Sequence, residues 1–195
     1  ICVVDEDELG TLRKIGVKDS KKLSPRKRNR LVKKIKQICD VDLIIVTPKE
    51  IDDALNSQEM NLNLLEGVTT TRLINRKQPD KVIIDLPAND ADRYEETIRS
   101  NLDDQDVEIV LEHKADENFP IVSAASIVAK TVRDSEVEKL EEQTGQTIGS
   151  GYPSDKRTIT FLRENIDKYP DMFRKSWKTY KKIKAEKNQQ GLDNY

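Results

Sequence analysis

Two aspartates occupy positions from which their carboxylates could take part in catalysis. Asp85 closes the apolar run 82–84, which has the composition of a buried strand. Asp116 follows the next strand-like segment, residues 107–111. Because functional groups gather at the carboxyl ends of strands in open α/β sheets, we expect both aspartates on one edge of a sheet. Two carboxylates there favour a site for Mg²⁺ or Mn²⁺, which take oxygen ligands and bridge to substrate phosphates. The alternative for Asp85 is a cap on the turn that leads to Pro87.

Composition restricts the other kinds of catalytic centre. His113 is the only histidine, so metal sites with several imidazoles are excluded and a Ser-His-Asp centre would have to use this residue. Cys2 and Cys39 are too few for a disulfide framework or a metal knuckle, which is typical of an intracellular chain with free thiols. Carboxylates are therefore expected to carry any chemistry.

Basic residues are clustered, although the formal net charge is only −2, with 34 basic and 36 acidic residues. Nine Lys or Arg residues and no acid lie between Lys21 and Lys36. Such a run is typical of a contact with a phosphate backbone, and the alternative is a solvated helix face that binds nothing. A second basic stretch, residues 174–184, surrounds Trp177 and Tyr180. We expect Trp177 in the core or at a docking contact.

Tyr152 is a different kind of candidate, because it stands between Gly151 and Pro153. An aromatic side chain on a constrained loop is well suited to meet a sugar with its ring and its hydroxyl. We therefore single out Tyr152 as a substrate-binding residue.

These side chains must be positioned by an alternation of strands and helices. Ser24-Pro25 predicts an N-cap followed by a first-turn proline, and Leu31, Ile35 and Ile38 then fall on one helix face. The alternation along the rest of the chain predicts an α/β layered domain whose sheet is at least partly parallel. We predict strands at residues 43–46, 81–85 and 107–111. Thr47 and Glu50 form a capping-box pattern, which predicts the start of a short helix after Thr47. Further helices are expected at 62–72, 94–102 and 122–140, and around 161–162 and 173–177.

The length of 195 residues suits one domain with an appendage. The sequence pattern changes near residue 150, where we expect a domain-like boundary. Residues 188–195 have the composition of a polar, flexible tail. No run of about 18 apolar residues and no signal peptide is visible, so we expect a soluble, cytoplasmic protein.

Four segments together resemble type 2 ribonuclease H (ribonuclease HII), above all its archaeal members. The similarity runs from about residue 1 to Lys182. The first segment is Lys18-Asp19-Ser20-Lys21-Lys22-Leu23, the second is residues 82–85, and the fourth is residues 149–155. The third combines Lys114-Ala115-Asp116 with Pro120, Ser123-Ala124-Ala125-Ser126-Ile127-Val128-Ala129-Lys130 and Arg133-Asp134. The first and third segments are the most specific, since neither is a generic motif.

The resemblance implies an α/β fold, namely a ribonuclease H-like mixed sheet flanked by helices with a C-terminal helical appendage. It divides the chain into a catalytic domain at residues 1–148, a helical substrate-binding region at 149–187 and a tail at 188–195. The implied enzyme is an endonuclease of DNA replication and repair. It hydrolyses the RNA strand of RNA/DNA hybrids and cuts 5′ to ribonucleotides in duplex DNA, by two-metal-ion catalysis that leaves a 3′-hydroxyl and a 5′-phosphate.

The same resemblance assigns roles to individual residues. Asp85 and Asp116 match catalytic carboxylates that bind Mg²⁺ or Mn²⁺. Tyr152 matches the tyrosine that senses the 2′-hydroxyl at a ribonucleotide junction. Lys21 and Lys22 are expected beside the substrate backbone.

One part of the family pattern is not visible in this sequence. The first strand of the family carries an Asp-Glu pair followed by a Gly-Arg-Gly turn, whereas Asp5-Glu6 is followed by Asp7-Glu8-Leu9-Gly10. We interpret residues 5–8 as an acidic loop after the second strand and expect the pair upstream of Ile1, as part of a longer enzyme. Without that pair, Asp85 and Asp116 are too few for two-metal hydrolysis, and we expect binding with little or no turnover.

The C-terminal residues resemble the peptide box with which replication proteins bind the sliding clamp. Gln189 is followed three residues later by Leu192 and three further by Tyr195, and a single helical turn would place the last two on one side. The second aromatic residue usual in that box is missing. The expected partners are RNA/DNA hybrids, ribonucleotide-containing duplex DNA and a sliding clamp. We expect the protein to be a monomer that does not bind a membrane.

Two alternatives stay open at this point. The first is another nuclease of ribonuclease H-like fold, such as a junction resolvase or an integrase, which would not demand a ribonucleotide in its substrate. The second is a catalytically dead nucleic-acid-binding protein, which metal-dependent cleavage would distinguish from both enzymes.

Overall fold

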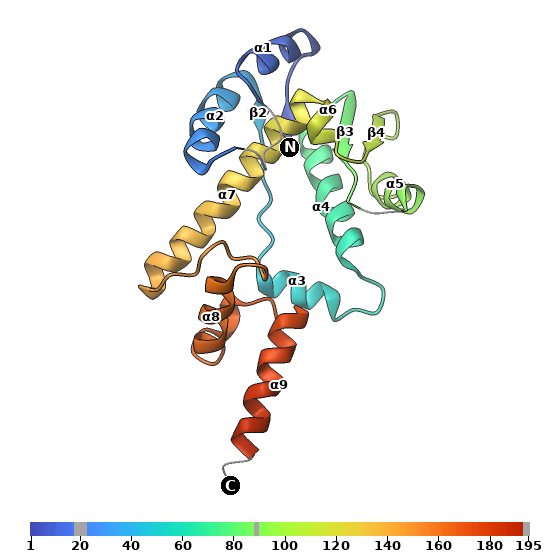
Figure 1. Cartoon of the computed structure of the whole chain (residues 1–195). Helices are drawn as coiled ribbons and strands as arrows, with labels where there is room; N and C mark the ends of the chain where they lie inside the picture. Colours follow the sequence, from blue (N-terminus) through green and yellow to red (C-terminus); the bar gives the residue numbers. More distant parts are fainter. Residues whose placement is uncertain (18–22, 88–89, 193–195) are drawn as a thin grey trace. The chain divides into compact units, whose positions relative to one another are not determined.

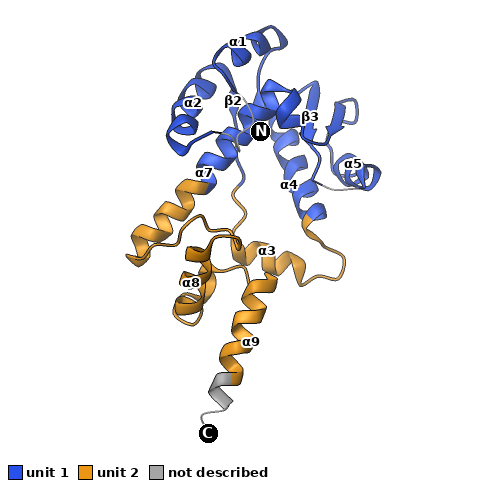
Figure 2. Ribbon diagram, in the orientation of Figure 1, with its two compact units in different colours: residues 1–44, 63–133 blue, residues 45–62, 134–195 orange. Residues whose placement is uncertain are grey.

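The computed structural model describes residues 1–17, 23–87 and 90–192, with only the backbone for 190–192 (Figure 1). The chain forms two compact units, each made of two stretches of sequence (Figure 2). Unit 1 contains Ile1–Ile44 and Asn63–Arg133, and unit 2 contains Ile45–Leu62 and Asp134–Tyr195. Lys21 and Lys22 lie outside the described residues, so their expected place beside the substrate stays a prediction.

A parallel strand pair organises one half of unit 1. β3 (Lys81–Asp85) pairs with β4 (Glu108–Glu112), and the register places Asp85 opposite Glu112. Parallel strands need a crossover, and α5 (Ala91–Arg99) supplies it here. The prediction of a partly parallel sheet is confirmed. Both strands therefore present their carboxyl ends at the same edge.

A core of aliphatic and aromatic side chains joins these strands to two helices. The apolar positions of β3 alternate between the two faces, and Val82 and Ile84 are the most buried. α4 (Leu62–Lys77) approaches α5 closely at Gly67, where an added Cβ would lie 3.0 Å from Cγ2 of Thr97. The buried members of this core are Ile74, Val82, Ile84, Leu86, Tyr94, Ile98, Leu102 and Val107.

The other half of unit 1 has a separate apolar cluster. β1 (Cys2–Val3) pairs antiparallel with β2 (Asp40–Val41), and the short helices η1 (Glu6–Glu8) and α1 (Leu9–Lys14) follow β1. α2 (Pro25–Ile38) begins as predicted, because the side chain of Ser24 accepts a hydrogen bond from the backbone N–H of Lys27. Leu12, Leu31 and Ile35 are buried in this cluster.

The prediction of a strand at residues 43–46 was wrong. The strand lies just before it, at Asp40–Val41, and residues 43–46 have no regular structure in the described chain. Ile45 is 55% exposed, and Oδ1 of Asp42 accepts a hydrogen bond from the N–H of Leu43, 2.7 Å away. A strand requires a neighbour that pairs with its backbone, and apolar composition cannot supply that information.

Unit 2 contains helices packed around aromatic side chains. α3 (Pro48–Leu55) starts with the predicted capping box between Thr47 and Glu50. α7 (Pro120–Thr144) begins in unit 1 and ends in unit 2, where α8 (Lys156–Asn165), η3 (Pro170–Met172) and α9 (Lys178–Leu192) follow. The rings of Phe161 and Phe173 lie 5.7 Å apart in the core, and Trp177 packs against it as expected.

The segment 173–177 is not the predicted helix. It consists of bends and turns, and α9 begins only at Lys178. The carboxylate of Asp52, on α3, accepts hydrogen bonds from the backbone N–H groups of Lys175 and Ser176 at 2.6 and 2.9 Å. Because these donors point to a side chain of another helix, they are not available for helical bonds.

The last described residues continue α9. Residues 188–192, which we expected in a flexible tail, are helical as far as Leu192. The boundary expected between residues 148 and 149 stays a prediction. Among the described residues, no helix has the length and apolar character needed to cross a membrane.

Candidate active site

The structure brings Asp85 and the segment of Asp116 together. Asp85 ends β3, and α6 (Ala115–Asn118) follows β4 after a short turn. The backbone N–H of Ala115 donates a hydrogen bond to Oδ1 of Asp85 at 3.2 Å. Asp116, the next residue, is only 3% exposed. The end of β3 and the backbone next to Asp116 therefore lie together, and the roles of the two aspartates stay a prediction.

The turn before α6 contains an unusual backbone conformation. Lys114 has φ 58° and ψ 36°, in the left-handed region. Its carbonyl accepts a hydrogen bond from the N–H of Glu117 at 2.9 Å, and the carbonyl of Ala115 accepts one from Phe119 at 2.8 Å. A residue other than glycine adopts this conformation at a cost, and such residues concentrate at functional sites. The turn is therefore specified by its surroundings.

A third carboxylate near Asp85 was missed by the sequence analysis. Glu66 belongs to α4. Partial desolvation by the surrounding protein, together with the negative charge of Asp85, raises the pKa of the Glu66 carboxyl above its ordinary value. No strand end or loop motif marks Glu66, so the sequence carries no signal that separates it from other helix-surface acids.

The donor set at Asp85 and Asp116 can be compared with what a divalent ion requires. Among the described residues, no group of three or more His, Cys, Asp or Glu side chains is arranged to hold a metal ion. Mg²⁺ in phosphoryl-transfer sites is usually held by one or two carboxylates, with waters and substrate phosphates completing its shell. By donor type and number, the carboxylates of Asp85 and Asp116 suit an ion that binds together with substrate.

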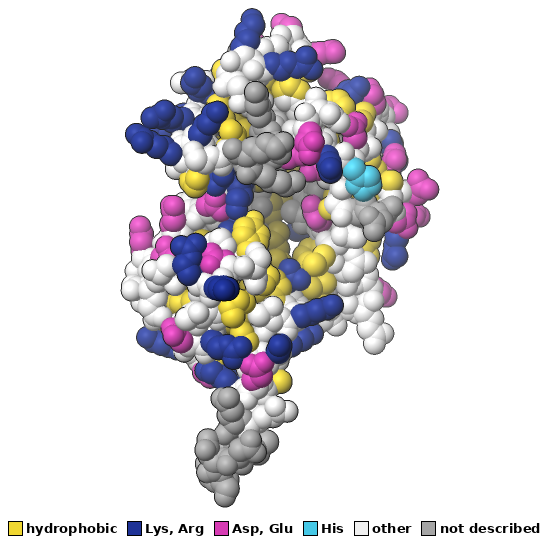
Figure 3. All heavy atoms as spheres, viewed as in Figure 1, with side chains coloured by type: hydrophobic (Ala, Val, Ile, Leu, Met, Phe, Trp, Pro, Cys, Tyr) yellow, Lys and Arg dark blue, Asp and Glu magenta, His cyan; other side chains and the backbone are white. Residues whose placement is uncertain are grey.

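α2 presents a basic surface in unit 1, and Figure 3 shows a group of Lys and Arg side chains over this helix. The helix contains no acidic residue, and among the described residues its exposed basic side chains form no ion pair. Arg28 differs from them, because it is buried and donates to the carbonyl of Leu23. The exposed basic residues are Arg26, Lys27, Arg30, Lys33, Lys34 and Lys36.

Tyr152 lies in unit 2 on the loop between α7 and α8, and its side chain is 43% exposed. Gly149 and Gly151 have positive φ, at 80° and 69°. The carboxylate of Asp155 accepts hydrogen bonds from the guanidinium of Arg157 and the backbone N–H of Ser150. These bonds hold the pKa of the Asp155 carboxyl well below its ordinary range.

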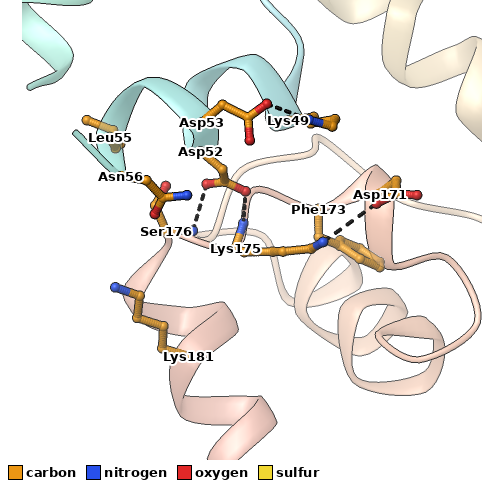
Figure 4. Close-up of a pocket in the computed structure, with 10 residues that line it drawn as sticks. All are labelled: Lys49, Asp52, Asp53, Leu55, Asn56, Asp171, Phe173, Lys175, Ser176 and Lys181. Atoms are coloured by element: carbon orange, nitrogen blue, oxygen red, sulfur yellow. Dashed lines mark hydrogen bonds and ion pairs between the residues drawn. The ribbon is translucent and has the colours of Figure 1, made fainter. Parts of the chain in front are cut away.

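A pocket of about 600 Å³ also lies in unit 2, between α3 and the start of α9 (Figure 4). Its carboxylates are engaged within the pocket. Asp53 pairs with Lys49 at 2.5 Å, and Asp171 pairs with Lys175 at 3.6 Å. Partial burial opposes ionisation of Asp52, but hydrogen bonds from Ser176 and Lys175 hold its pKa below the ordinary value. The two bonds to Asp52 join α3 to the segment before α9.

The residues expected to contact a clamp are only partly described. Gln189 is exposed on α9, and Leu192 is the last residue of that helix. Tyr195 lies outside the described residues.

Comparison with known proteins identifies the family. The family model of ribonuclease HII matches residues 1–180. The ribonuclease HII of Thermococcus onnurineus is 46% identical over 190 residues, which cover 94% of this chain and 81% of that protein.

Two solved structures are similar over most of the chain. The ribonuclease H2 of Pyrococcus horikoshii has a TM-score of 0.83 at 40% identity and covers 95% of this chain and 88% of its own. The ribonuclease HII of Archaeoglobus fulgidus, solved in a complex with PCNA, has a TM-score of 0.80 at 37% identity, with 94% and 85% covered. The expected ribonuclease H-like fold is confirmed. The chain therefore belongs to the ribonuclease HII family and is a hydrolase of the ribonuclease H type.

Proposed function

We propose that this protein is an endonuclease that cuts the RNA strand of RNA/DNA hybrids and cuts duplex DNA on the 5′ side of embedded ribonucleotides. The products are a 3′-hydroxyl and a 5′-phosphate. The observation that carries the proposal is the hydrogen bond from Ala115 to Asp85. It ties together the two segments whose carboxylates match the catalytic positions of the family.

Asp85 and Asp116 are assigned as ligands of Mg²⁺ or Mn²⁺. Divalent ions of this kind supply an activated water and stabilise the leaving oxygen in phosphodiester hydrolysis. Asp85 is partly exposed at the strand end, so substrate phosphate can reach it, whereas burial of Asp116 limits its mobility. The chain's own contribution is to hold both carboxylates in place through the backbone of α6.

Substrate binding is assigned to the basic surface of α2, with Lys21 and Lys22 just before it, and to Tyr152. Exposed cations without an acidic partner on their helix can neutralise phosphates, and they carry no base preference. Tyr152 supplies a ring that stacks against a sugar and a hydroxyl that reaches its 2′-oxygen. In this proposal, α2 supplies affinity for the duplex and Tyr152 supplies selectivity for the sugar.

The test is cleavage of a duplex that carries one ribonucleotide, compared with the same duplex in all-DNA form, with Mg²⁺ or Mn²⁺. Asp85→Asn and Asp116→Asn are expected to abolish cleavage while the duplex still binds. Asp92→Asn is the matched control, because Asp92 is exposed on α5 in the same unit.

Three outcomes separate the candidates. Cleavage only at the ribonucleotide supports the proposal. Equal cleavage of the all-DNA duplex identifies another nuclease of the same fold. Binding without any metal-dependent cleavage is the result expected if Asp85 and Asp116 alone are too few for two-metal hydrolysis. It overturns the enzymatic proposal for residues 1–195 and leaves a nucleic-acid-binding protein as their description.

We also propose that Gln189, Leu192 and Tyr195 bind a sliding clamp. The support is the spacing of the three residues and the PCNA complex of the Archaeoglobus fulgidus relative. Deletion of residues 189–195 is expected to abolish the affinity for the clamp, measured by titration calorimetry, and Asn188→Ala is expected to leave it unchanged. Unchanged affinity after the deletion contradicts the assignment.

A further inference from the structure

The loop before Tyr152 is held by side chains from two helices. The N–H groups of Ile148 and Gly149 both donate to Oε1 of Glu141, at 2.6 and 3.0 Å. The N–H of Ser150 donates to Oδ2 of Asp155 at 2.8 Å. Three consecutive backbone donors therefore have side-chain acceptors.

The fourth donor in this run is also satisfied by a side chain. The N–H of Gly151 donates to Oγ1 of Thr158 at 3.0 Å, and the same hydroxyl donates to the carbonyl of Ile148 at 2.8 Å. Thr158 is 4% exposed on α8. The backbone path from Ile148 to Gly151 is therefore specified at every N–H, although it belongs to no helix or strand.

The position of Glu141 is electrostatically unfavourable for the helix that carries it. α7 ends at Thr144, and its last turn contains no basic residue. A carboxylate near a helix C-terminus interacts unfavourably with the helix dipole, so its charge is not explained by helix stability. Its acceptor oxygen instead satisfies two loop donors that would otherwise lack a partner.

The loop has no room for a Cβ atom at Gly149. Gly149 has φ 80°, and a Cβ there would lie 2.8 Å from Oδ2 of Asp155 and 2.9 Å from Cβ of Arg157. The close approach of backbone to the N-terminus of α8 therefore depends on this glycine. The backbone that leads to Tyr152 is therefore held at four consecutive N–H groups, and Tyr152 itself is 43% exposed.

We infer that Glu141 is a positioning residue for ribose recognition: it holds the Tyr152 loop in the one conformation in which the tyrosine meets a 2′-hydroxyl. The inference rests on the proposed function, because it assigns that contact to Tyr152. It adds a residue that touches no substrate and acts through the backbone. Thr158 holds the other end of the same loop.

The first test measures the loop directly. Amide hydrogen exchange of residues 148–152 in the full chain is expected to be faster in Glu141→Ala than in the unmodified protein. Glu141→Gln keeps an acceptor oxygen at the same place and is expected to restore slow exchange. Glu142→Ala removes a neighbouring exposed carboxylate and is the matched control. Unchanged exchange in Glu141→Ala overturns the inference.

The second test measures selectivity as the ratio of two dissociation constants, for an all-DNA duplex and for the same duplex with one ribonucleotide. Glu141→Ala is expected to lower this ratio roughly tenfold, the equivalent of one hydrogen bond, while affinity for the all-DNA duplex is unchanged. Tyr152→Ala should give the same loss. Glu141→Gln and Glu142→Ala should keep the original ratio.

Thr158 gives an independent pair of variants. Thr158→Val keeps the shape of the side chain and removes the hydroxyl, so it should lower the ratio, whereas Thr158→Ser should keep it. If the unmodified protein binds both duplexes equally, the proposed role of Tyr152 is wrong, and the inference fails with it. If it discriminates but Glu141→Ala discriminates equally well despite faster exchange, only the positioning role is wrong.

Discussion

The backbone N–H of Ala115 donates to Oδ1 of Asp85 at 3.2 Å, across 30 residues of sequence. This bond connects the end of β3 to the first turn of α6. It fixes one carboxylate through a backbone atom that adjoins the second, Asp116. The position of the Asp85 carboxylate is therefore linked to the backbone that carries Asp116.

The variants Asp85→Asn and Asp85→Ala are expected to differ in their free energy of unfolding. Asn retains the oxygen that accepts from Ala115, so Asp85→Asn should unfold in urea at nearly the same free energy as the unmodified protein. Asp85→Ala removes the acceptor and should cost about 1 kcal/mol. Equal stability of the two variants would show that the bond does not contribute to folding.

Lys114 should respond to substitution according to backbone conformation rather than side-chain chemistry. Its φ of 58° lies in the left-handed region, where L-residues cost roughly 1–2 kcal/mol. Lys114→Gly should therefore be neutral or stabilising by up to about 1 kcal/mol, and Lys114→Val should destabilise, because a β-branched residue disfavours this conformation. Thermal and urea unfolding measure both. A stabilising valine would contradict the explanation.

Asp155 predicts a pH dependence of stability. Its folded-state pKa is depressed by Arg157 and by the N–H of Ser150, so the stabilisation is present above the unfolded pKa of about 3.9 and is lost as pH falls through the folded value. Asp155→Asn should be less stable than the unmodified protein at pH 7, and the difference should shrink below the ordinary aspartate range. A difference that stays constant down to pH 2 would refute this.

The basic surface of α2 predicts the salt dependence of duplex binding. Replacing Lys33 and Lys34 with Gln should weaken binding to hybrid and all-DNA duplexes alike. Each lost phosphate contact should lower the slope of log K against log salt concentration by about 0.9. Lys81→Gln is the control, because Lys81 is paired with Glu108 at 2.6 Å. An unchanged slope would exclude α2 from the interface.

Nearby residues were sufficient to predict the elements whose formation depends on local interactions. The N-cap at Ser24 and the capping box at Thr47 predicted where α2 and α3 begin, because each satisfies helix donors within four residues. The apolar run before Asp85 predicted β3, and the alternation of elements predicted its parallel partner. The two parallel strands in turn predicted a common sheet edge for Asp85 and the loop that contains Asp116.

Only the tertiary structure decided the features that depend on a distant partner. Residues 43–46 have the composition of a strand but no neighbour that pairs with them among the described residues, whereas the turns at 173–177 are held by Asp52, more than 120 residues away. The acceptor role of Glu141 is likewise invisible in sequence, since nothing local distinguishes it from Glu142. Sequence thus determined helix starts, the parallel pair and the residue types of the site, because those rest on local propensity and hydrophobic periodicity. The tertiary structure determined which backbone donors each carboxylate satisfies, because a hydrogen bond depends on proximity in space rather than along the chain.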